Sequence, residues 1–493
     1  LHILFHRRWI VMHGLNHYKT YKNATAYHHG RLFRRINTIR AGPHTDVNDT
    51  LHGLLCANAT SPTNAGPLRE SDRASSSDLL SSLPPPRTGR SAWRGPDMVA
   101  RRSEWELHLS PAEIAEVEAA VAALIQQAEQ EVAAAAAGAQ QQEEVRQEEQ
   151  QQQPLEQRWW CGQVAEVVSP AVVAAVQRRL VALRPEQFPL PTLGPRLQAL
   201  RSHLLHGPGF ALLRRLPVER YSPLQCAASF LGLGAHLGSP RSQNARGHLL
   251  GHVADLGASS AANPHVRIYQ TCERQTFHTD SCDVVGLLCL REARQGGDSL
   301  LVSADTLFNE LRSACPQLLA RLLAPMPHDR RGEVPAGERP FFEIPVFSWH
   351  ADQLTVFYQR QYFDSAQRFP EARRLTEEDV AALNALDALA DDPRLHLRMR
   401  LAPGDMQWVH NHNMLHDRTA FTEGGGEEEE EQAEQQREPG RCGRHLLRLW
   451  LAVPGARELP PAFAARYGSL TVGDRGGIVV PGLVDFQVPL LPE

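Results

Sequence analysis

The sequence predicts an α+β fold, a β-sandwich or jelly roll that carries helices on its outside. The second half of the 493-residue chain holds many short apolar segments separated by Gly, Pro and Asp, as in an antiparallel β structure. A few helical patterns lie between these segments. The chain has no G-x-G-x-x-G after a predicted strand and no P-loop, which argues against the common nucleotide-binding folds.

Helical patterns dominate the chain before the predicted strands. The stretch SPAE at 110–113 is a capping box with proline at the first helical position, and apolar residues at helical spacing follow it. This pattern predicts a helix over about 111–130. Further helices are predicted over 197–206 and about 222–234, with a short strand at 210–216 between them.

The predicted strands of the second half alternate or run as short apolar segments. Turns are expected at 296–298 and 403–405, and helices at about 305–323 and 377–390. The strand segments are VVGLLCL (284–290), SLLVS (299–303), RLHLRMRL (394–401), MQWVHN (406–411) and LLRLWLAV (446–453).

Composition divides the chain into four parts. Residues 1–95 lack sustained periodicity and are predicted to be disordered; their basic start is typical of a transit peptide or of a mispredicted start, with Met98 as the alternative beginning. A helical segment follows over 96–132 and a low-complexity linker over 133–157. One large domain is predicted over 158–493, with an acidic insert at 423–440.

Charge, hydropathy and cysteine content indicate which binding partners and which cellular compartment to expect. The net charge of -5 is small and no basic stripe stands out, so no nucleic-acid partner is expected. No apolar run is long enough to cross a bilayer, so no membrane partner is expected either. Eight cysteines without a C-x-x-C predict reduced, buried thiols and an intracellular, cytoplasmic protein, with organelle targeting as the alternative.

A possible metal site begins at QTFHTDSCDVVG (275–286). His278 and Asp280 are two apart on a predicted strand and therefore share one face. The later stretch GDMQWVHNHNMLHDRTAF offers His410, His412 and His416 as a third ligand. Two histidines and a carboxylate suit Fe(II) with three open positions, and they also suit zinc with a bound water. The ligand types leave both metals open, and a solvated His and Asp at a strand end is the alternative.

Two arginines favour a bound diacid. Arg444 and Arg448 are four apart on a predicted strand, so they share a face and lie about 13 Å apart. Leu446 and Trp450 are on the same face, where an unpaired guanidinium would be costly. Each arginine therefore requires a carboxylate, supplied either by the protein or by a ligand.

Residues 158–493 resemble the taurine and 2,4-dichlorophenoxyacetate dioxygenase (TauD/TfdA) family, Fe(II)- and 2-oxoglutarate-dependent oxygenases that include clavaminate synthase-like proteins. The resemblance implies a double-stranded β-helix core and the metal ligands His278, Asp280 and His416, which makes His410 and His412 bystanders. It rests on four stretches in this order: FHTD (277–280), GGDS (296–299), GDMQWVHNHNMLHDRTAF (404–421) and RHLLRLWL (444–451).

The resemblance also implies the co-substrate site and the reaction. Ser299 and Arg444 would bind the distal carboxylate of 2-oxoglutarate, and Arg448 would bind its other end or an anionic group of the substrate. The implied reaction uses dioxygen and releases succinate and carbon dioxide while a small, anionic organic substrate is hydroxylated or desaturated, often in secondary metabolism. Asp280 argues against halogenation, because relatives that halogenate lack the carboxylate ligand.

The substrate pocket is expected to include Tyr358, Arg360, Gln361 and Tyr362, although an aromatic strand followed by a surface loop explains these residues equally well. Two other functions stay open: a zinc-binding cupin-like hydrolase or isomerase, and a non-catalytic binding protein with the same fold.

The spacing between His416 and Arg444 departs from the family. The gap of 28 residues is longer than is usual there, and it contains the acidic low-complexity stretch. Removing the 17 residues 424–440 leaves 28 − 17, or 11, residues. Because surface loops lengthen at modest entropic cost, the insert is expected to leave its flanking strands in place.

Overall fold

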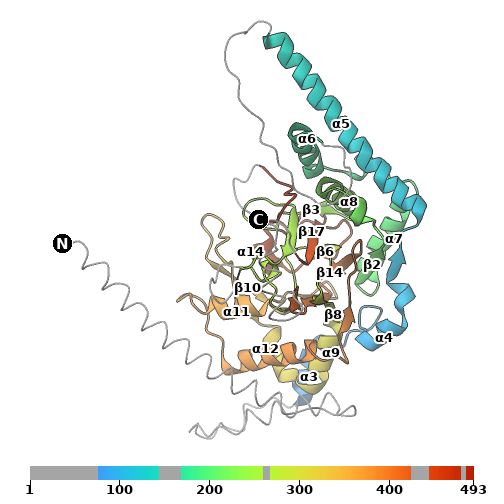
Figure 1. The fold of residues 1–493 in the computed structure, drawn as a ribbon. Helices are drawn as coiled ribbons and strands as arrows, with labels where there is room; N and C mark the ends of the chain where they lie inside the picture. The colour runs from blue at the N-terminus through green and yellow to red at the C-terminus, as the bar shows by residue number, and fades with distance from the viewer. Residues whose placement is uncertain (1–75, 144–167, 259–266, 424–442, 479–484, 493) are drawn as a thin grey trace, which may run out of the picture. The chain divides into compact units, whose positions relative to one another are not determined.

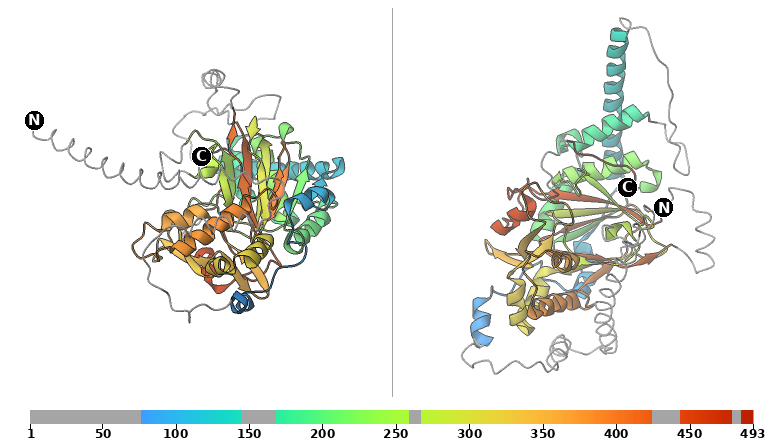
Figure 2. Two further views of the ribbon diagram at one scale, coloured as in Figure 1. Left: turned by 90° about the horizontal axis from the view of Figure 1, so that it is seen from below. Right: turned by 90° about the vertical axis from the view of Figure 1, so that its left-hand side faces the viewer.

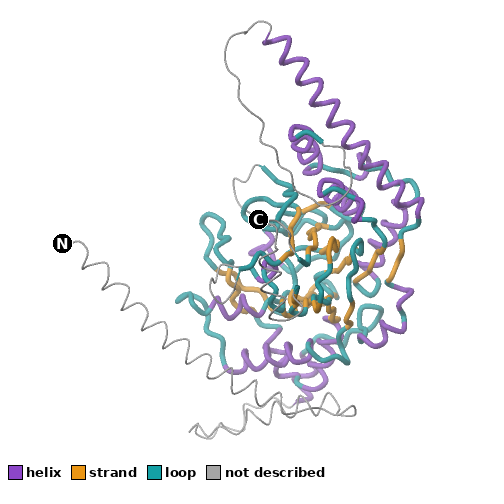
Figure 3. Tube along the Cα trace, viewed as in Figure 1, coloured by secondary structure: helices purple, strands orange, loops and turns teal. Residues whose placement is uncertain are grey.

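The computed structural model describes residues 76–143, 168–258, 267–423, 443–478 and 485–492. Within this part of the chain the strands gather at the centre and helices lie around them (Figure 3). Two sheets make up the core, one of seven strands and one of four. This is the double-stranded β-helix that the sequence predicted, and it combines helices and strands as an α+β fold.

The larger sheet has the order β1-β2-β14-β6-β17-β3, and β4 pairs with β17. Except for the parallel pair β1 and β2, neighbouring strands in this sheet are antiparallel. Its strands are β1 (Glu106–His108), β2 (Phe210–Arg214), β3 (Ser239–Pro240), β4 (Leu250–Ala254), β6 (Val284–Arg291), β14 (Met406–His410) and β17 (His445–Ala452).

The smaller sheet has the order β13-β8-β15-β5 and is antiparallel throughout. Its strands are β5 (Gln275–His278), β8 (Ser299–Ser303), β13 (Leu397–Met399) and β15 (Met414–Arg418). Three short two-stranded pairs accompany the two sheets: β7 (Gln295–Gly296) with β16 (Phe421–Thr422), β9 (Pro325–Asp329) with β10 (Phe341–Pro345), and β11 (Phe347–His350) with β12 (Gln353–Val356).

Helices flank the strands on two sides (Figures 1 and 2). One group packs on the outer face of the larger sheet: α5 (Pro111–Glu143), α6 (Pro170–Val181), α7 (Leu193–His206) and α8 (Pro223–Ala235). The remaining helices are α3 (Ser76–Ser82), α4 (Gly95–Ala100), α9 (Ala304–Ala314), α10 (Pro316–Leu322), α11 (Arg360–Ala366), α12 (Glu377–Ala390) and α14 (Ala464–Tyr467).

Alternation along β17 decides which residues reach the space between the sheets. Leu447, Leu449 and Leu451 pack with the helices of the outer face. Leu446 and Trp450 belong instead to the apolar cluster between the two sheets. Because side chains alternate along a strand, Arg448 points inward with this second set.

The turn between β14 and β15 carries the chain from the larger sheet to the smaller one. In the smaller sheet His416 of β15 lies directly opposite His278 of β5 and opposite Leu301 of β8. Side chains of directly paired residues lie on the same face, so this register brings two histidines that are far apart in the sequence together on the inner face.

Most predicted elements are confirmed, and the differences have local causes. The helix predicted over about 111–130 continues to Glu143, because alanine, glutamine and glutamate favour helix and the low-complexity stretch extends it. The helix predicted at about 305–323 is divided at Pro316 into α9 and α10. In the segment 394–401 all four alternating apolar residues are buried, but only Leu397–Met399 pairs as a strand.

Residues 76–95 fall in the region predicted to be disordered, but they include helix α3 and a buried tryptophan. Trp93 is buried, its Nε1 donates a hydrogen bond to Pro208 O at 2.8 Å, and its ring lies 5.2 Å from that of Phe210. A single aromatic residue in a polar stretch gives no periodic signal, so its burial depends on tertiary contacts. The division into four parts stays a prediction, and its segments 1–75, 144–157 and 424–440 fall outside the described residues.

The five cysteines that the structure describes are all free thiols, and all of them except Cys272 are buried. None of the described helices combines the length and the apolar character that a bilayer crossing requires.

Candidate active site

The predicted metal ligands come together from three elements. His278 ends β5, Asp280 follows it in the loop before β6, and His416 is the central residue of β15. The two imidazole rings lie 4.1 Å apart by their centroids, and His416 Nε2 lies 3.8 Å from Asp280 Oδ2. One ligand atom from each side chain lies within 4.8 Å of the other two, and all three residues are buried. We call these three residues the ligand trio.

Neighbouring groups orient the ligand trio. Thr276 O lies 2.8 Å from His278 Nδ1, which therefore carries the proton and leaves Nε2 as the ligand atom. Trp450 Nε1 donates a hydrogen bond of 2.9 Å to Asp280 Oδ2. Gln275 Nε2 lies 3.0 Å from His278 Nε2, so this amide would turn away when the nitrogen binds a metal. Such outer contacts fix the direction in which ligands present their lone pairs.

His416 provides the test of whether a metal fits. Its Nε2 is buried and has no hydrogen-bond partner among the described residues. A buried polar atom without a partner is costly, and a metal bound to this nitrogen would remove the cost. Two imidazoles and one carboxylate form the donor set that non-haem Fe(II) sites use.

The protonation states also suit a divalent metal. Burial, together with the neighbouring His278, lowers the pKa of the His416 imidazole to about 3, so the ring is neutral. Burial alone would raise the pKa of Asp280, but the nearby Arg448 and the two histidines outweigh burial and the pKa is lowered. Neutral imidazoles and an ionised carboxylate are the forms that bind metal.

Arg448 of β17 lies beside the ligand trio. Its Nη1 is 3.6 Å from Asp280 Oδ1, and its Nε donates a hydrogen bond of 2.8 Å to Gln243 Oε1. The guanidinium carbon lies 4.7 Å from the ring centroid of Tyr269 and 5.0 Å from that of Trp450. These contacts hold the guanidinium against the carboxylate from two sides.

Ser299 and Arg444 lie near one another at the start of β8. Arg444 Nη2 donates a hydrogen bond of 3.0 Å to Gly297 O, two residues before Ser299. Arg444 Nη1 is buried without a partner among the described residues, and burial lowers the pKa of Arg444 to about 10. The Ser299 hydroxyl donates to Gln407 Oε1 at 2.9 Å. A buried guanidinium with an unused donor suits an incoming carboxylate.

Arg418 adds a second buried guanidinium that the sequence interpretation gave no role. It lies opposite Ser299 in the pairing of β15 with β8, and its Nε and Nη1 have no partners in the described structure. The guanidinium carbons of Arg418 and Arg444 lie 4.9 Å and 5.5 Å from the ring centroid of Phe421. The motif LHDRTAF contained Arg418, but its position opposite Ser299 depends on the strand register.

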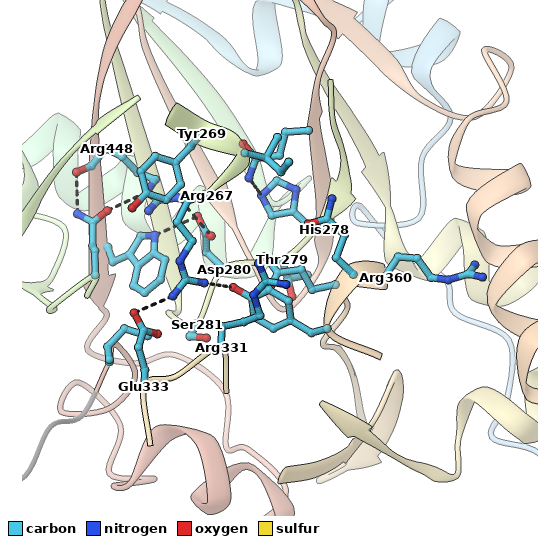
Figure 4. Close-up of a pocket in the computed structure, with 18 of the residues that line it drawn as sticks. Arg267, Tyr269, His278, Thr279, Asp280, Ser281, Arg331, Glu333, Arg360 and Arg448 are labelled. Atoms are coloured by element: carbon cyan, nitrogen blue, oxygen red, sulfur yellow. Dashed lines mark hydrogen bonds and ion pairs between the residues drawn. The ribbon is translucent and has the colours of Figure 1, made fainter. Parts of the chain in front are cut away.

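A cavity opens beside the ligand trio, and three of the four residues predicted between positions 358 and 362 line it. Gln361 and Tyr362 line it, as do His278, Asp280 and Arg448. Arg360 also borders the cavity, but its guanidinium pairs with Asp387 Oδ2 at 2.7 Å and extends away from the other labelled residues (Figure 4). Tyr358 does not line the cavity; its hydroxyl donates to Asp387 at 2.5 Å.

His410 and His412 lie outside the ligand trio, as expected. His412 Nε2 lies 3.0 Å from Asp283 Oδ1, and this carboxylate also accepts hydrogen bonds from Arg475 Nε and from the backbone N–H of Val453, each at 2.9 Å. His410 is buried, and neither ring nitrogen has a partner in the described part of the chain. Burial lowers the pKa of both histidines, so the rings are neutral.

The polar residues of the cavity that were missed from sequence include Gln243, Ser281 and Arg466. Gln243 holds Arg448, and Ser281 Oγ accepts a hydrogen bond of 2.9 Å from Arg466 Nε. Ser281 follows Asp280 directly, which was a usable signal. Gln243 and Arg466 come from distant segments and gave none.

The chain is similar to several known proteins. FR-33289 synthase of Streptomyces rubellomurinus is 32% identical over 281 residues, which cover 57% of this chain and 80% of that protein. Taurine hydroxylase-like protein SAT17 of Stachybotrys chartarum is 29% identical over 273 residues, covering 52% and 69%. The solved structure of an asparagine oxygenase with Fe(II), 2S,3S-3-hydroxyasparagine and succinate aligns at 19% identity with a TM-score of 0.42, covering 70% of this chain and 93% of that one.

A family model decides the assignment. The model described as "Taurine catabolism dioxygenase TauD, TfdA family" matches residues 176–450, more than half of the chain. The matched segment contains the ligand trio, Ser299, Arg444 and Arg448. Nothing in these comparisons supports a zinc hydrolase, an isomerase or a non-catalytic protein. The chain belongs to the taurine catabolism dioxygenase TauD, TfdA family and is an Fe(II)- and 2-oxoglutarate-dependent dioxygenase.

Proposed function

We propose that this enzyme hydroxylates or desaturates a small anionic substrate in the cavity beside the ligand trio, with 158–493 as its catalytic domain. His278, Asp280 and His416 bind Fe(II), and Ser299 and Arg444 bind the distal carboxylate of 2-oxoglutarate. The observation that supports this most directly is the buried, unpartnered Nε2 of His416 beside two further ligand atoms. When bound, Fe(II) supplies the redox chemistry that couples decarboxylation of 2-oxoglutarate by dioxygen to attack on a C–H bond.

The protein's own contribution is orientation and charge. Thr276 fixes the tautomer of His278, and Trp450 and Arg448 hold the carboxylate of Asp280 in place. At the other end of the site, Arg444 carries a buried charge whose unused donor would be satisfied by the distal carboxylate.

The cavity supports an anionic substrate. It is lined by five arginines and two carboxylates, so positive charge is in excess: Arg267, Arg331, Arg360, Arg448 and Arg466 against Asp280 and Glu333. One relative is named as taurine hydroxylase-like, and taurine is a small sulfonate. Gln361 and Tyr362 are proposed substrate contacts, whereas the side chains of Tyr358 and Arg360 are engaged by Asp387.

The proposal is tested by anaerobic titration of the full chain with Fe(II) and 2-oxoglutarate. We expect the weak visible charge-transfer band of the chelate to appear and to saturate at one equivalent of each. Aerobic incubation should then release succinate slowly without substrate, and a small carboxylate or sulfonate that fits the cavity should accelerate the release. Absence of the band with metal bound would contradict the assigned ligands.

The acidic insert gives a prediction of its own. The backbone N–H of Arg444 donates a hydrogen bond of 2.6 Å to Glu423 Oε1, so the two ends of the segment 424–442 are joined. Deleting 424–440 should therefore leave Arg444 in place and change the Kd for 2-oxoglutarate by less than about twofold. Calorimetric titration with 2-oxoglutarate measures this, and loss of binding would show that the segment contributes to the site.

A further inference from the structure

The arginines that line the cavity differ in whether a carboxylate of the protein pairs with them. Arg267 Nη2 lies 2.9 Å from Glu333 Oε1, and both residues face each other in Figure 4. Arg360 is paired with Asp387. These two guanidinium groups therefore have carboxylate partners without any ligand.

Arg466 has no such partner. It lies in α14, after the last strand of the core, and is 8% exposed. Its Nε donates to Ser281 Oγ, its guanidinium carbon lies 5.7 Å from the ring centroid of Phe342, and no acidic side chain of the described residues lies within 4.0 Å of it. Its two Nη groups make no hydrogen bond in the described structure, and Arg466 is one of the residues that line the cavity. A guanidinium this buried requires an anion.

Arg448 is only partly compensated. Its nearest carboxylate is Asp280, at 3.6 Å, and Asp280 belongs to the ligand trio and also accepts the Trp450 N–H. Arg331, the remaining cavity arginine, has its guanidinium carbon 5.8 Å from the ring centroid of Tyr362. Arg448 and Arg466 thus face one cavity whose two carboxylates, Asp280 and Glu333, are already engaged.

We propose that Arg448 and Arg466 together bind a phosphoryl group of the substrate, either a phosphate monoester or a phosphonate, and that Arg466 is the residue that selects it. The inference rests on the function proposed above. A phosphoryl dianion offers three acceptor oxygens and about two negative charges, which match two guanidinium forks better than a sulfonate or a carboxylate does. Arg466 lies beyond the segment 176–450 that the family model matches.

The experiment compares ethyl phosphate with ethyl sulfate, two ligands of nearly equal shape. A phosphate monoester has a second pKa of about 6, so at pH 8 it carries two charges and the sulfate one. Binding to the full chain loaded anaerobically with Fe(II) and 2-oxoglutarate is measured by calorimetry. We expect ethyl phosphate to bind about tenfold more tightly than ethyl sulfate, because the sulfate makes one charge-assisted contact fewer.

Substitutions of Arg466 test whether this residue causes the preference for phosphate over sulfate. Arg466→Gln should reduce the ratio of the two dissociation constants to about one, whereas Arg400→Gln, which removes an exposed arginine paired with Glu292, should leave it unchanged. If Arg466→Gln unfolds, Arg466→Lys keeps the charge without the fork and should give an intermediate ratio. Equal binding of the two ligands by the unmodified chain would overturn the inference, as would an unchanged ratio in Arg466→Gln.

The chelate band separates this inference from the proposed function. A normal chelate band alongside equal binding leaves the proposed function intact, whereas absence of the band contradicts that function.

Discussion

Replacing His416 with alanine is expected to abolish the visible band of the Fe(II) and 2-oxoglutarate chelate and to lower succinate release to the background rate. The substitution removes one of three ligands, and the two that remain are too few to hold Fe(II) with defined open positions. Folding should survive, because His416 Nε2 makes no hydrogen bond in the described structure and only packing contacts are lost. Metal content after dialysis, measured together with the anaerobic spectrum, provides the test.

The matched control is His410→Leu. His410 is buried in the same stretch of sequence, and neither of its ring nitrogens has a hydrogen-bond partner among the described residues, so an apolar side chain of similar size replaces it at modest cost. This variant should retain the chelate band. A band of normal intensity in His416→Ala would show that another residue is the third ligand.

Replacing Arg444 with alanine should raise the Kd for 2-oxoglutarate by about 10- to 150-fold, which corresponds to the 1.5 to 3 kcal/mol of a hydrogen bond to a charged group. Fe(II) binding should change little, because Arg444 contacts Gly297 and Phe421 rather than the ligand trio. The measurement is anaerobic titration of the Fe(II)-loaded chain with 2-oxoglutarate, followed by the chelate band.

Arg400→Ala serves as the control for removal of one positive charge, since its side chain is 54% exposed and pairs with Glu292 on the surface. Its Kd for 2-oxoglutarate should stay close to that of the unmodified chain. An unaltered Kd in Arg444→Ala would move the distal-carboxylate site elsewhere, and Arg418, with two unpartnered nitrogens opposite Ser299, would be the next candidate.

The pattern of apolar residues in the sequence was sufficient to predict the strands of the core. The apolar segments at 284–290 and 446–453 became β6 and β17, which pair along most of their length. The H-x-D pair pointed to the metal site, although Asp280 lies in the loop after β5 and not on the strand. Trp450 was placed correctly beside Arg448, because residues two apart on a strand share a face. Local spacing therefore predicted which side chains face inward.

Contacts between distant segments were not predictable in this way. Tyr358 and Arg360 were both expected in the substrate cavity. Arg360 does line it and Tyr358 does not, and Asp387 of α12 engages both side chains. Conversely, Arg466 reaches the cavity from a helix of four residues, Ala464–Tyr467, that has no periodic signal. Both outcomes depend on how elements pack, and one sequence does not reveal this packing.

The hydrogen bonds of Asp283 show which residues after the last core strand the catalytic domain requires. This carboxylate lies three residues after Asp280, and two of the groups that satisfy it, Arg475 and the backbone of Val453, lie beyond the segment that the family model matches. A chain shortened to the family boundary at residue 450 would leave this buried carboxylate with His412 alone of its three partners. The minimal active fragment must therefore include the tail through Arg475.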